Sequence, residues 1–167
     1  MDCSLFKSPQ YGGSGGGAFN DLKSYPDIVG IRGLRIRSGN QVDSIQATYL
    51  LRYGNTIEGP KHGGYGGSEH SFTLGEGEVL TGMEGKTNGM LVDQLTFHSN
   101  WGRKYGPYGR TGRTLFKIEG TAFVAFFGRS GNLLDAIGVM MSSRDRDEGI
   151  KFRIMNSSEW FVALYSL

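Results

Sequence analysis

The sequence alternates between two kinds of glycine-containing segment, and this alternation limits the folds open to the chain. The pattern Gly-x-x-aliphatic-Asp-x-aliphatic occurs at Gly39–Ile45, Gly89–Leu95 and Gly131–Ile137. Before each of them lies a glycine-rich segment. Gly12–Gly16 recurs as Gly63–Gly67, and Gly106–Arg110 is interpreted as a degraded copy in which Arg110 replaces the last glycine. The order predicts three similar units of roughly 40 to 50 residues with threefold internal symmetry.

The repeated Gly-x-x-x-Asp spacing is more frequent than the composition explains. It occurs four times, whereas the numbers of glycine and aspartate residues alone would give about one match. The fourth match, Gly17–Asp21, lacks both aliphatic positions and is interpreted as a chance occurrence. The other three share their flanking positions and are therefore interpreted as a true repeat.

Between the glycines, short stretches alternate in polarity with the period of half-buried strands. Apolar residues share one parity over Ser44–Tyr53, and shorter alternations occur at Leu34–Arg37 and Leu95–His98. From Asp2 to Gly149, no window of helical length combines a 3.6-residue period with freedom from glycine. The chain is therefore predicted to be all-β, with short antiparallel strands in a sandwich, a barrel or a prism.

Composition excludes several classes of protein. Glycine is 28 of 167 residues with only four prolines and no Gly-X-Y period, which excludes collagen. A net charge of +2 does not favour nucleic acid or an anionic membrane as partner, and no apolar run approaches a transmembrane segment. The single Cys3 excludes an internal disulfide framework. Because the start lacks the pattern of a signal peptide, we expect a cytoplasmic protein, or an extracellular one if a leader was removed or export is unconventional.

Catalytic chemistry has little support in the sequence. His62, His70 and His98 fall in different segments without metal-ligand spacing, and no nucleophilic triad can be read. Glu76 and Glu78 are flanked by glycines and predict a solvated hairpin rather than a glycosidase pair. We therefore expect no enzyme, no catalytic residue, no metal and no cofactor.

The two loop types suit a polyol. A glycine turn exposes backbone N–H groups to close approach, and an aspartate held opposite accepts hydrogen bonds from hydroxyl groups. A phosphate would be repelled by the aspartate, and the lysine and helix of a P-loop are missing. The alternative is structural, since glycine turns close hairpins and aspartates bind nearby N–H groups. Repetition alone does not decide, because a symmetric fold also repeats its turns.

Longer runs resemble a known family. Leu95–Gly109 and Phe127–Gly138, together with Gly12–Phe19 and Gly59–Gly63, resemble the jacalin-related lectins closely. The resemblance covers residues 9–142, the predicted lectin domain, and leaves residues 143–167 as a C-terminal extension. It implies a β-prism I fold, in which three four-stranded Greek-key sheets surround a pseudo-threefold axis. It also implies sugar binding without a metal.

The resemblance implies a main sugar site between the first glycine loop and the last Gly-x-x-x-Asp loop. Carried over, Gly16, Asn132 and Leu133 would donate backbone N–H groups, and Asp135 would bind two hydroxyls. Asn132 stands where many relatives have aspartate, a mild change if only its N–H is used. Galactose-preferring relatives depend on a cleaved chain beside this site, whereas the glycine loop here is internal and uncut. The resemblance therefore favours mannose or glucose.

The internal repeat extends this prediction to two further loop pairs. The predicted second site consists of Asn40, Gln41, Asp43, Gly66 and Gly67. The doubtful third site consists of Met90, Leu91, Asp93, Gly109 and Arg110. We expect the third to be inactive toward neutral mannose, because the Arg110 side chain would fill the cleft. With Arg103, Lys104 and Arg113 nearby, an acidic glycan is the alternative ligand there.

The predicted function is a multivalent, non-enzymatic lectin for mannose- or glucose-type glycans. A single shallow site with millimolar affinity contributes only about −4 kcal/mol, so two sites or an oligomer would be needed for avidity. The glycine-free tail Ile150–Leu167 contains the apolar run Trp160–Leu164, which needs cover. We expect a homodimer through this tail, or a cap on the same chain. The alternative function is a protein-interaction or matrix-organising prism.

Overall fold

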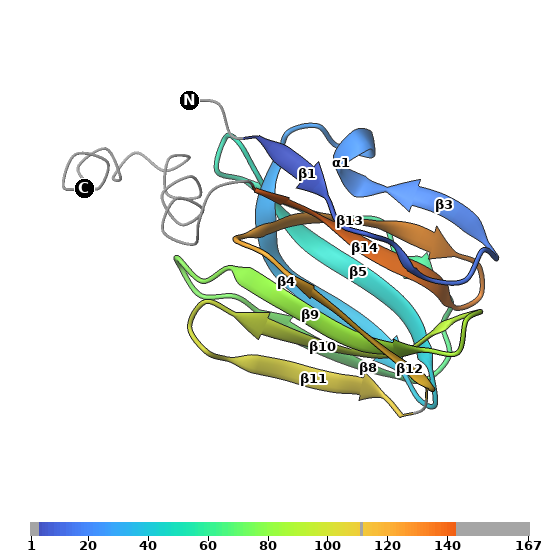
Figure 1. The fold of residues 1–167 in the computed structure, drawn as a ribbon. Coiled ribbons are helices and arrows are strands. Elements are labelled where there is room, and N and C mark those ends of the chain that lie inside the picture. Colours follow the sequence, from blue (N-terminus) through green and yellow to red (C-terminus); the bar gives the residue numbers. More distant parts are fainter. Residues whose placement is uncertain (1–3, 111, 143–167) are drawn as a thin grey trace.

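The computed structural model describes residues 4–110 and 112–142. Their strands form three antiparallel sheets that enclose a common core (Figure 1). This confirms the predicted all-β class and its three sheets. The tail predicted to mediate dimerisation or to cap the prism lies outside the described residues.

Each sheet is built on the same path of four strands. The second sheet has the order β6-β5-β4-β8 with β7 beside β5, and the third has β11-β10-β9-β12. The first joins both ends of the described chain in the order β1-β14-β13-β3, with β2 beside β14. Each sheet has a long central hairpin, and one outer strand reaches it by a crossover, which is a Greek-key connection. The predicted threefold repeat is therefore one sheet per unit.

The strand bounds follow the order of the sheets. The first sheet contains β1 (Leu5–Lys7), β2 (Tyr11–Gly12), β3 (Gly17–Asn20), β13 (Phe123–Ser130) and β14 (Leu134–Ser142). The second contains β4 (Ile28–Ser38), β5 (Val42–Leu51), β6 (Thr56–Glu58), β7 (His62–Gly63) and β8 (Ser68–Thr73). The third contains β9 (Leu80–Thr87), β10 (Val92–Ser99), β11 (Lys104–Gly109) and β12 (Thr114–Glu119).

Aromatic side chains from all three sheets meet in the core. Phe97 of β10 lies edge-on to Phe126 of β13, with ring centroids 6.1 Å apart, and its centroid is 6.0 Å from that of Phe72 in β8. Such tilted pairs contribute beyond the area they bury. Because each ring comes from a different sheet, this cluster fixes the sheets relative to one another.

The sequence placed two local features incorrectly. The alternation over Ser44–Tyr53 predicted one strand, but β5 ends at Leu51, and Tyr53 is 78% exposed in the turn that follows. A one-turn helix, α1 (Asp21–Ser24), also forms where none was predicted. Its N-cap is Asn20, whose side-chain oxygen accepts from the Lys23 N–H at 3.0 Å. Four residues are too few to show a helical period.

The carboxylate of the fourth Gly-x-x-x-Asp match belongs to the core. Asp21 is 2% exposed, and Tyr49 Oη donates to its Oδ2 at 2.6 Å. Asp21 Oδ1 lies 2.7 Å from His62 Nε2, and the Phe126 N–H donates to Tyr49 Oη at 3.1 Å. This network joins the first and second sheets, so Asp21 has a structural role.

The segment Glu76–Glu78 was predicted as a solvated hairpin, but it is a turn between β8 and β9, which lie in different sheets. Glu76 is exposed as predicted, with 76% of its side chain accessible. Glu78 is fully buried, where it accepts the Gly75 N–H at 2.9 Å and the Tyr105 hydroxyl at 2.8 Å. Burial alone would raise the pKa of Glu78, but hydrogen bonds from Ser99 and these two partners outweigh it and lower the pKa. The prediction was wrong for Glu78, because the flanking glycines suggested an exposed turn, whereas Tyr105 and Ser99 reach this carboxylate from distant strands.

Candidate sugar-binding site

The three Gly-x-x-x-Asp segments are the turns of the three central hairpins, and they gather at one end of the prism. This is the right-hand end in Figure 1, where the glycine loops also lie. The loops contact one another in a ring. The first glycine loop meets the third turn, because a Cβ on Gly13 would overlap the backbone of Met90. The second meets the first-sheet turn, because a Cβ on Gly64 would overlap the backbone of Asn132. The third meets the second-sheet turn, since the Arg110 N–H donates to Asn40 O at 3.2 Å.

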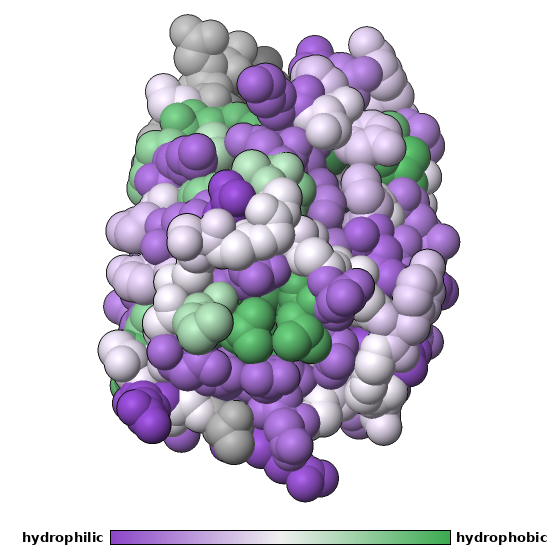
Figure 2. Space-filling model, turned by 90° about the vertical axis from the view of Figure 1, so that its right-hand side faces the viewer, coloured by the Kyte–Doolittle hydropathy of each residue, from purple (hydrophilic) through white to green (hydrophobic). Residues whose placement is uncertain are grey.

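Figure 2 looks onto this end of the molecule. The surface is mostly hydrophilic, with one apolar group below its middle and another at its upper left. Met90, at the tip of the third turn, is 73% exposed, and Tyr65 of the second glycine loop is 80% exposed. Polar backbone and a few apolar side chains therefore share the face on which the loops converge.

The first predicted site comes together in the structure. Gly16 has φ +65°, and a Cβ there would lie 2.7 Å from Asp135 Oδ2, while one on Gly15 would lie 2.6 Å from Asp135 Oδ1. The turn that holds Asn132 and Leu133 begins at Gly131, where a Cβ would lie 3.7 Å from Gly16 Cα. The glycine backbone thus lies directly against the carboxylate, with space that only a residue without Cβ leaves open.

The second predicted site repeats this geometry. Gly67 has φ +67°, and a Cβ there would lie 2.7 Å from Asp43 Oδ2, while one on Gly66 would lie 2.5 Å from Asp43 Oδ1. Asn40 and Gln41 occupy the turn that begins at Gly39, where a Cβ would lie 3.8 Å from Gly67 Cα. Asp43 and Asp135 are both half-buried. In both sites the structure therefore brings the predicted glycines together with the predicted aspartate, and the other predicted residues lie in the turn between that aspartate and the glycine that begins it.

Sequence reasoning missed an arginine in each of these two loop pairs. Arg129 donates from Nε to Gly15 O at 2.9 Å and from Nη2 to Gly16 O at 2.8 Å. Arg37 makes the same two bonds to Gly66 O and Gly67 O, at 2.9 and 2.8 Å. The available signal was the Arg-Ser-Gly string that begins both turns and is absent from the third.

The third turn differs in length and in its hydrogen bonds. Ser38 pairs with Val42 around three turn residues, whereas Thr87 pairs with Val92 around four. The extra residue is Asn88, and its Oδ1 accepts from the Met90 N–H at 2.8 Å and from the Leu91 N–H at 3.0 Å. The backbone donors predicted to face a sugar in this copy are thus already bonded within the turn.

The predicted alignment of the third glycine segment is shifted by three residues. A Cβ on Gly109 would overlap Asp93 O, as one on Gly12 would overlap Asp135 O, so Gly109 matches the first glycine of the loop rather than the fourth. Thr114 then pairs with Thr87 as Gly17 pairs with Ser130. Arg113, and not Arg110, therefore follows the glycines at the position of Gly16. The repeat was too degraded to show this register.

The cationic cluster predicted around the third copy is only partly assembled. Lys104 pairs with His98, while Gly109 pairs with Gln94, four residues away along β10. At about 3.3 Å per residue, Arg103 and Lys104 lie roughly 13 Å or more from the Gly109 end of the strand. Only Arg110 and Arg113 remain at the loop end.

The third carboxylate is covered. Asp93 is 1% exposed, and burial raises its pKa. A Cβ on Gly112 would lie 3.2 Å from Asp93 Cβ and would overlap Lys86. The loop at Gly112 therefore packs directly against β9 and β10. The Asn88 amide reaches Asp93 Oδ1 at 3.4 Å. This copy brings its predicted residues near one another without leaving an open carboxylate.

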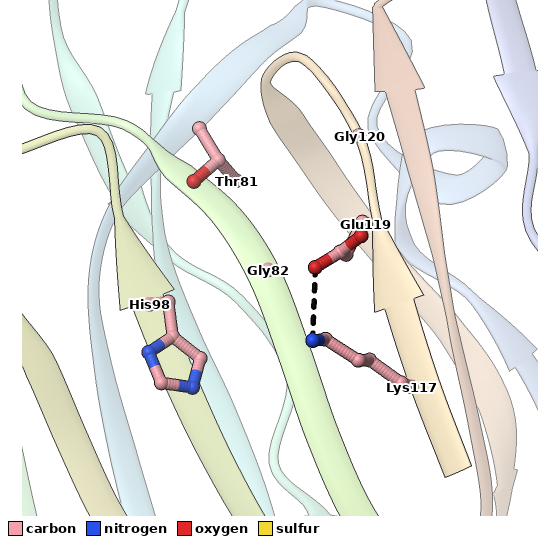
Figure 3. A pocket seen from close by; sticks show the side chains of 6 residues that line it. All are labelled: Thr81, Gly82, His98, Lys117, Glu119 and Gly120. Atoms are coloured by element: carbon pink, nitrogen blue, oxygen red, sulfur yellow. Dashed lines mark ion pairs between the residues drawn. The ribbon is translucent and has the colours of Figure 1, made fainter. Parts of the chain in front are cut away.

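A separate hollow lies on the outer face of the third sheet (Figure 3). Its volume is about 440 Å³, and its lining consists of Thr81, Gly82, His98, Lys117, Glu119 and Gly120. Two of its lining side chains, Lys117 and Glu119, form an ion pair with Nζ 3.0 Å from Oε1. A third, His98, has Nε2 3.1 Å from Oε1 of the neighbouring Glu84. None of the predicted sugar-binding residues lines this hollow.

The described residues do not suggest a metal site or a membrane span. Among residues 4–110 and 112–142, no three His, Cys, Asp or Glu side chains gather as metal ligands would. In the same part of the chain, no helix has the length and apolar character needed to cross a bilayer.

The fold and its loops define a β-prism lectin domain. The family model of the Jacalin-like lectin domain matches residues 8–140, and the chain belongs to this family. Griffithsin from Griffithsia sp. is 31% identical and covers 78% of this chain and 92% of its own length. A galactose-specific lectin from Morus indica is 37% identical, over 74% of this chain and 82% of that protein. AcmJRL, a mannose-binding jacalin-related lectin from Ananas comosus, superposes with a TM-score of 0.74 at 32% identity, over 81% and 96% of the chains.

Proposed function

We propose that this chain is a non-enzymatic lectin that binds mannose- or glucose-type glycans through two of its three loop pairs. The observation that carries the proposal is the repeated geometry of Gly16 with Asp135 and of Gly67 with Asp43. In both pairs the glycine lies in the left-handed region, and a Cβ there would lie 2.7 Å from a carboxylate oxygen. The third copy of the same turn does not keep this arrangement, since Asp93 is 1% exposed and its loop lies against Lys86. The symmetric fold therefore does not by itself require it.

The chemistry of such a pair suits adjacent sugar hydroxyls. Asp135 accepts hydrogen bonds from two hydroxyl groups, and bonds to an ionised acceptor are stronger than neutral ones. The backbone N–H groups of Gly16, Asn132 and Leu133 donate to the sugar oxygens. Since glycine has no side chain, the sugar ring approaches the main chain closely. No step of bond making or breaking is needed for this function.

The continuous glycine loop favours mannose or glucose over galactose, whereas the relatives include proteins of both specificities. AcmJRL is described as mannose-binding, whereas the Morus indica relative is described as galactose-specific. In this chain Gly16 lies within a continuous loop that leads from β2 to β3, with β1 before it. A free amino group beside the loop, on which galactose-preferring relatives depend, is therefore not part of this arrangement.

Multivalency follows from the placement of both open pairs on one rigid end of the prism. The Gly64 contact with Asn132 places the second glycine loop against the turn of the first site. Two weak sites held at a fixed separation raise avidity toward a branched glycan without any new contact. The third copy contributes no neutral-sugar site, because its donors and its carboxylate are bonded or covered.

A glycan array combined with calorimetry tests the proposal. Wild type is expected to bind mannose-rich glycans, Asp135→Ala and Asp43→Ala each to lose one of two sites, and the double variant to lose binding. Asp27→Ala is the matched control, because Asp27 is an exposed aspartate paired with Arg52. Absence of glycan binding by wild type, or unchanged binding by the double variant, would overturn the proposal.

A further inference from the structure

We propose that Arg129 and Arg37 are positioning residues for the two sugar sites, each fixing the direction of one glycine N–H in the loop that lies against the carboxylate. The inference rests on the proposed function, since it says how the donors of those sites are oriented. Nothing in the resemblance to jacalin-related lectins assigns these two side chains a role.

The glycine loop needs an external constraint. Five of the six residues in Gly12–Gly17 are glycine, the residue with the greatest backbone freedom. Gly13 is anchored, since its N–H donates to Asp135 O at 2.8 Å, and Gly17 is anchored by its pairing with Ser130 in β13. Between these anchors, the Arg129 guanidinium holds the carbonyls of Gly15 and Gly16.

The covalent geometry of the peptide links this clamp to sugar binding. In a trans peptide the C=O of one residue and the N–H of the next lie in one plane and point in opposite directions. Arg129 holds the Gly15 C=O at 2.9 Å, and this bond therefore fixes the direction of the Gly16 N–H. The second bond, to Gly16 O at 2.8 Å, fixes the next peptide plane. A planar guanidinium makes both bonds from one rigid group.

The second site has the same clamp on the equivalent residues of the repeat. Arg37 holds Gly66 O at 2.9 Å and so fixes the direction of the Gly67 N–H. Its Nη1 also lies 3.9 Å from Glu69 Oε1. Arg37 pairs with Glu69 in the neighbouring strand, whereas Arg129 pairs with Ala18 at the same position of the first site. The equal bond lengths in both sites, despite these different surroundings, indicate that the fork itself is the shared element.

The third copy has no arginine at this position, and it is the copy whose carboxylate is covered. Lys86 occupies the ladder position of the two arginines, pairing with Gln94 as Arg37 pairs with Ser44. An ammonium group is a point charge and cannot hold two carbonyls with one planar fork. In this copy the loop lies on the strand, and Asp93 is only 1% exposed.

The test compares Arg129→Gln and Arg37→Gln in the full-length, ¹⁵N-labelled protein. Without sugar, Arg129→Gln is expected to lower the order parameter of the Gly16 amide from about 0.85 to below about 0.6 and to leave Gly67 unchanged. In a titration with methyl α-mannoside, the affinity of the first site is expected to fall about tenfold, because preorganisation is lost. Arg37→Gln should give the reciprocal result.

Two further variants keep the test specific. Arg129→Lys retains the charge but only one donor nitrogen. Its Gly16 order parameter and its sugar affinity are expected to lie between those of wild type and Arg129→Gln. Arg35→Gln is the matched control, because Arg35 lies on the same strand as Arg37 but pairs with Glu58 at 3.2 Å. It should change neither readout.

The outcomes separate the clamp from the proposed function. If wild type binds no saccharide, the proposed function fails, while the order parameters still decide the clamp. If Arg129→Gln keeps a rigid Gly16 and full affinity, the clamp is refuted. If Arg129→Gln lowers the sugar affinity equally at both sites and also lowers Tm, the clamp is refuted as well, because that result indicates general destabilisation.

Discussion

Substitution of Gly16 by alanine tests the contact between the glycine loop and the carboxylate most simply. Gly16 has φ +65°, and a Cβ there would lie 2.5 Å from Ser130 O and 2.7 Å from Asp135 Oδ2. The first of these atoms is backbone within the β13 hairpin and cannot rotate away. Alanine therefore meets both conformational strain and a steric overlap.

The cost follows from these two terms. A residue with a Cβ loses about 1 to 2 kcal/mol in the left-handed region. Forcing extra atoms into a packed site costs about 1 to 3 kcal/mol more. We expect the free energy of unfolding to fall by about 2 to 5 kcal/mol and Tm to fall by roughly 6 to 20 °C. A loop that shifts to relieve the overlap also displaces the Gly16 N–H that is proposed to donate to the sugar. Mannose affinity at the first site therefore falls even where stability is regained.

Urea unfolding and calorimetry with methyl α-mannoside measure both effects. Gly17→Ala is the control, because a Cβ on Gly17 meets nothing within 4 Å and its φ lies outside the left-handed region. Gly67→Ala should reproduce the loss at the second site, where the distances are the same within 0.1 Å. Full stability and affinity in Gly16→Ala, or equal damage in Gly17→Ala, would refute the reasoning.

Three further predictions follow from the buried polar groups and the tail. Burial raises the pKa of Asp93 above its ordinary value of 3.8. The folded protein therefore loses stability as pH rises from about 3.8 through the raised pKa, because the buried carboxyl must then ionise. Asp93→Asn is expected to raise the urea midpoint at pH 7, with a smaller gain at pH 3. A lower midpoint for Asp93→Asn at pH 7 would contradict this. Tyr49→Phe removes the partner of Asp21 Oδ2 and of the Phe126 N–H, while Asp21 Oδ1 keeps His62. It should cost about 1 to 3 kcal/mol in urea unfolding, whereas an unchanged midpoint would show that the network is dispensable. We also expect a dimer through residues 143–167, so light scattering should show a dimer for the full chain and a monomer for residues 1–143; an unchanged mass on truncation would remove that idea.

The fold was largely predictable because its signals are local and repeated. Each Gly-x-x-x-Asp segment forms the turn of a central hairpin, and the alternating apolar residues at Ile45, Leu95 and Phe97 are buried as their parity predicts. The aspartate loops also lie against the glycine loops that the repeat paired with them. Symmetry in the sequence thus carried over into symmetry of the sheets.

Features that depend on distant partners were not predictable from the sequence. The clamp joins Arg129 to Gly15 across 114 residues, and the partners of Glu78 come from other strands. The register of the third glycine segment is set by pairing of Thr114 with Thr87, which a degraded repeat does not encode. In each case a long-range contact overrode the local pattern.

The most direct test of the account is a titration of the ¹⁵N-labelled protein with methyl α-mannoside, followed at the glycine amides. The account predicts saturable shifts at Gly16 and Gly67, with the Gly112 amide unmoved. Shifts confined to Gly112 or to the hollow around His98, or no shift at any glycine up to about 100 mM sugar, a limit well above millimolar dissociation constants, would contradict it.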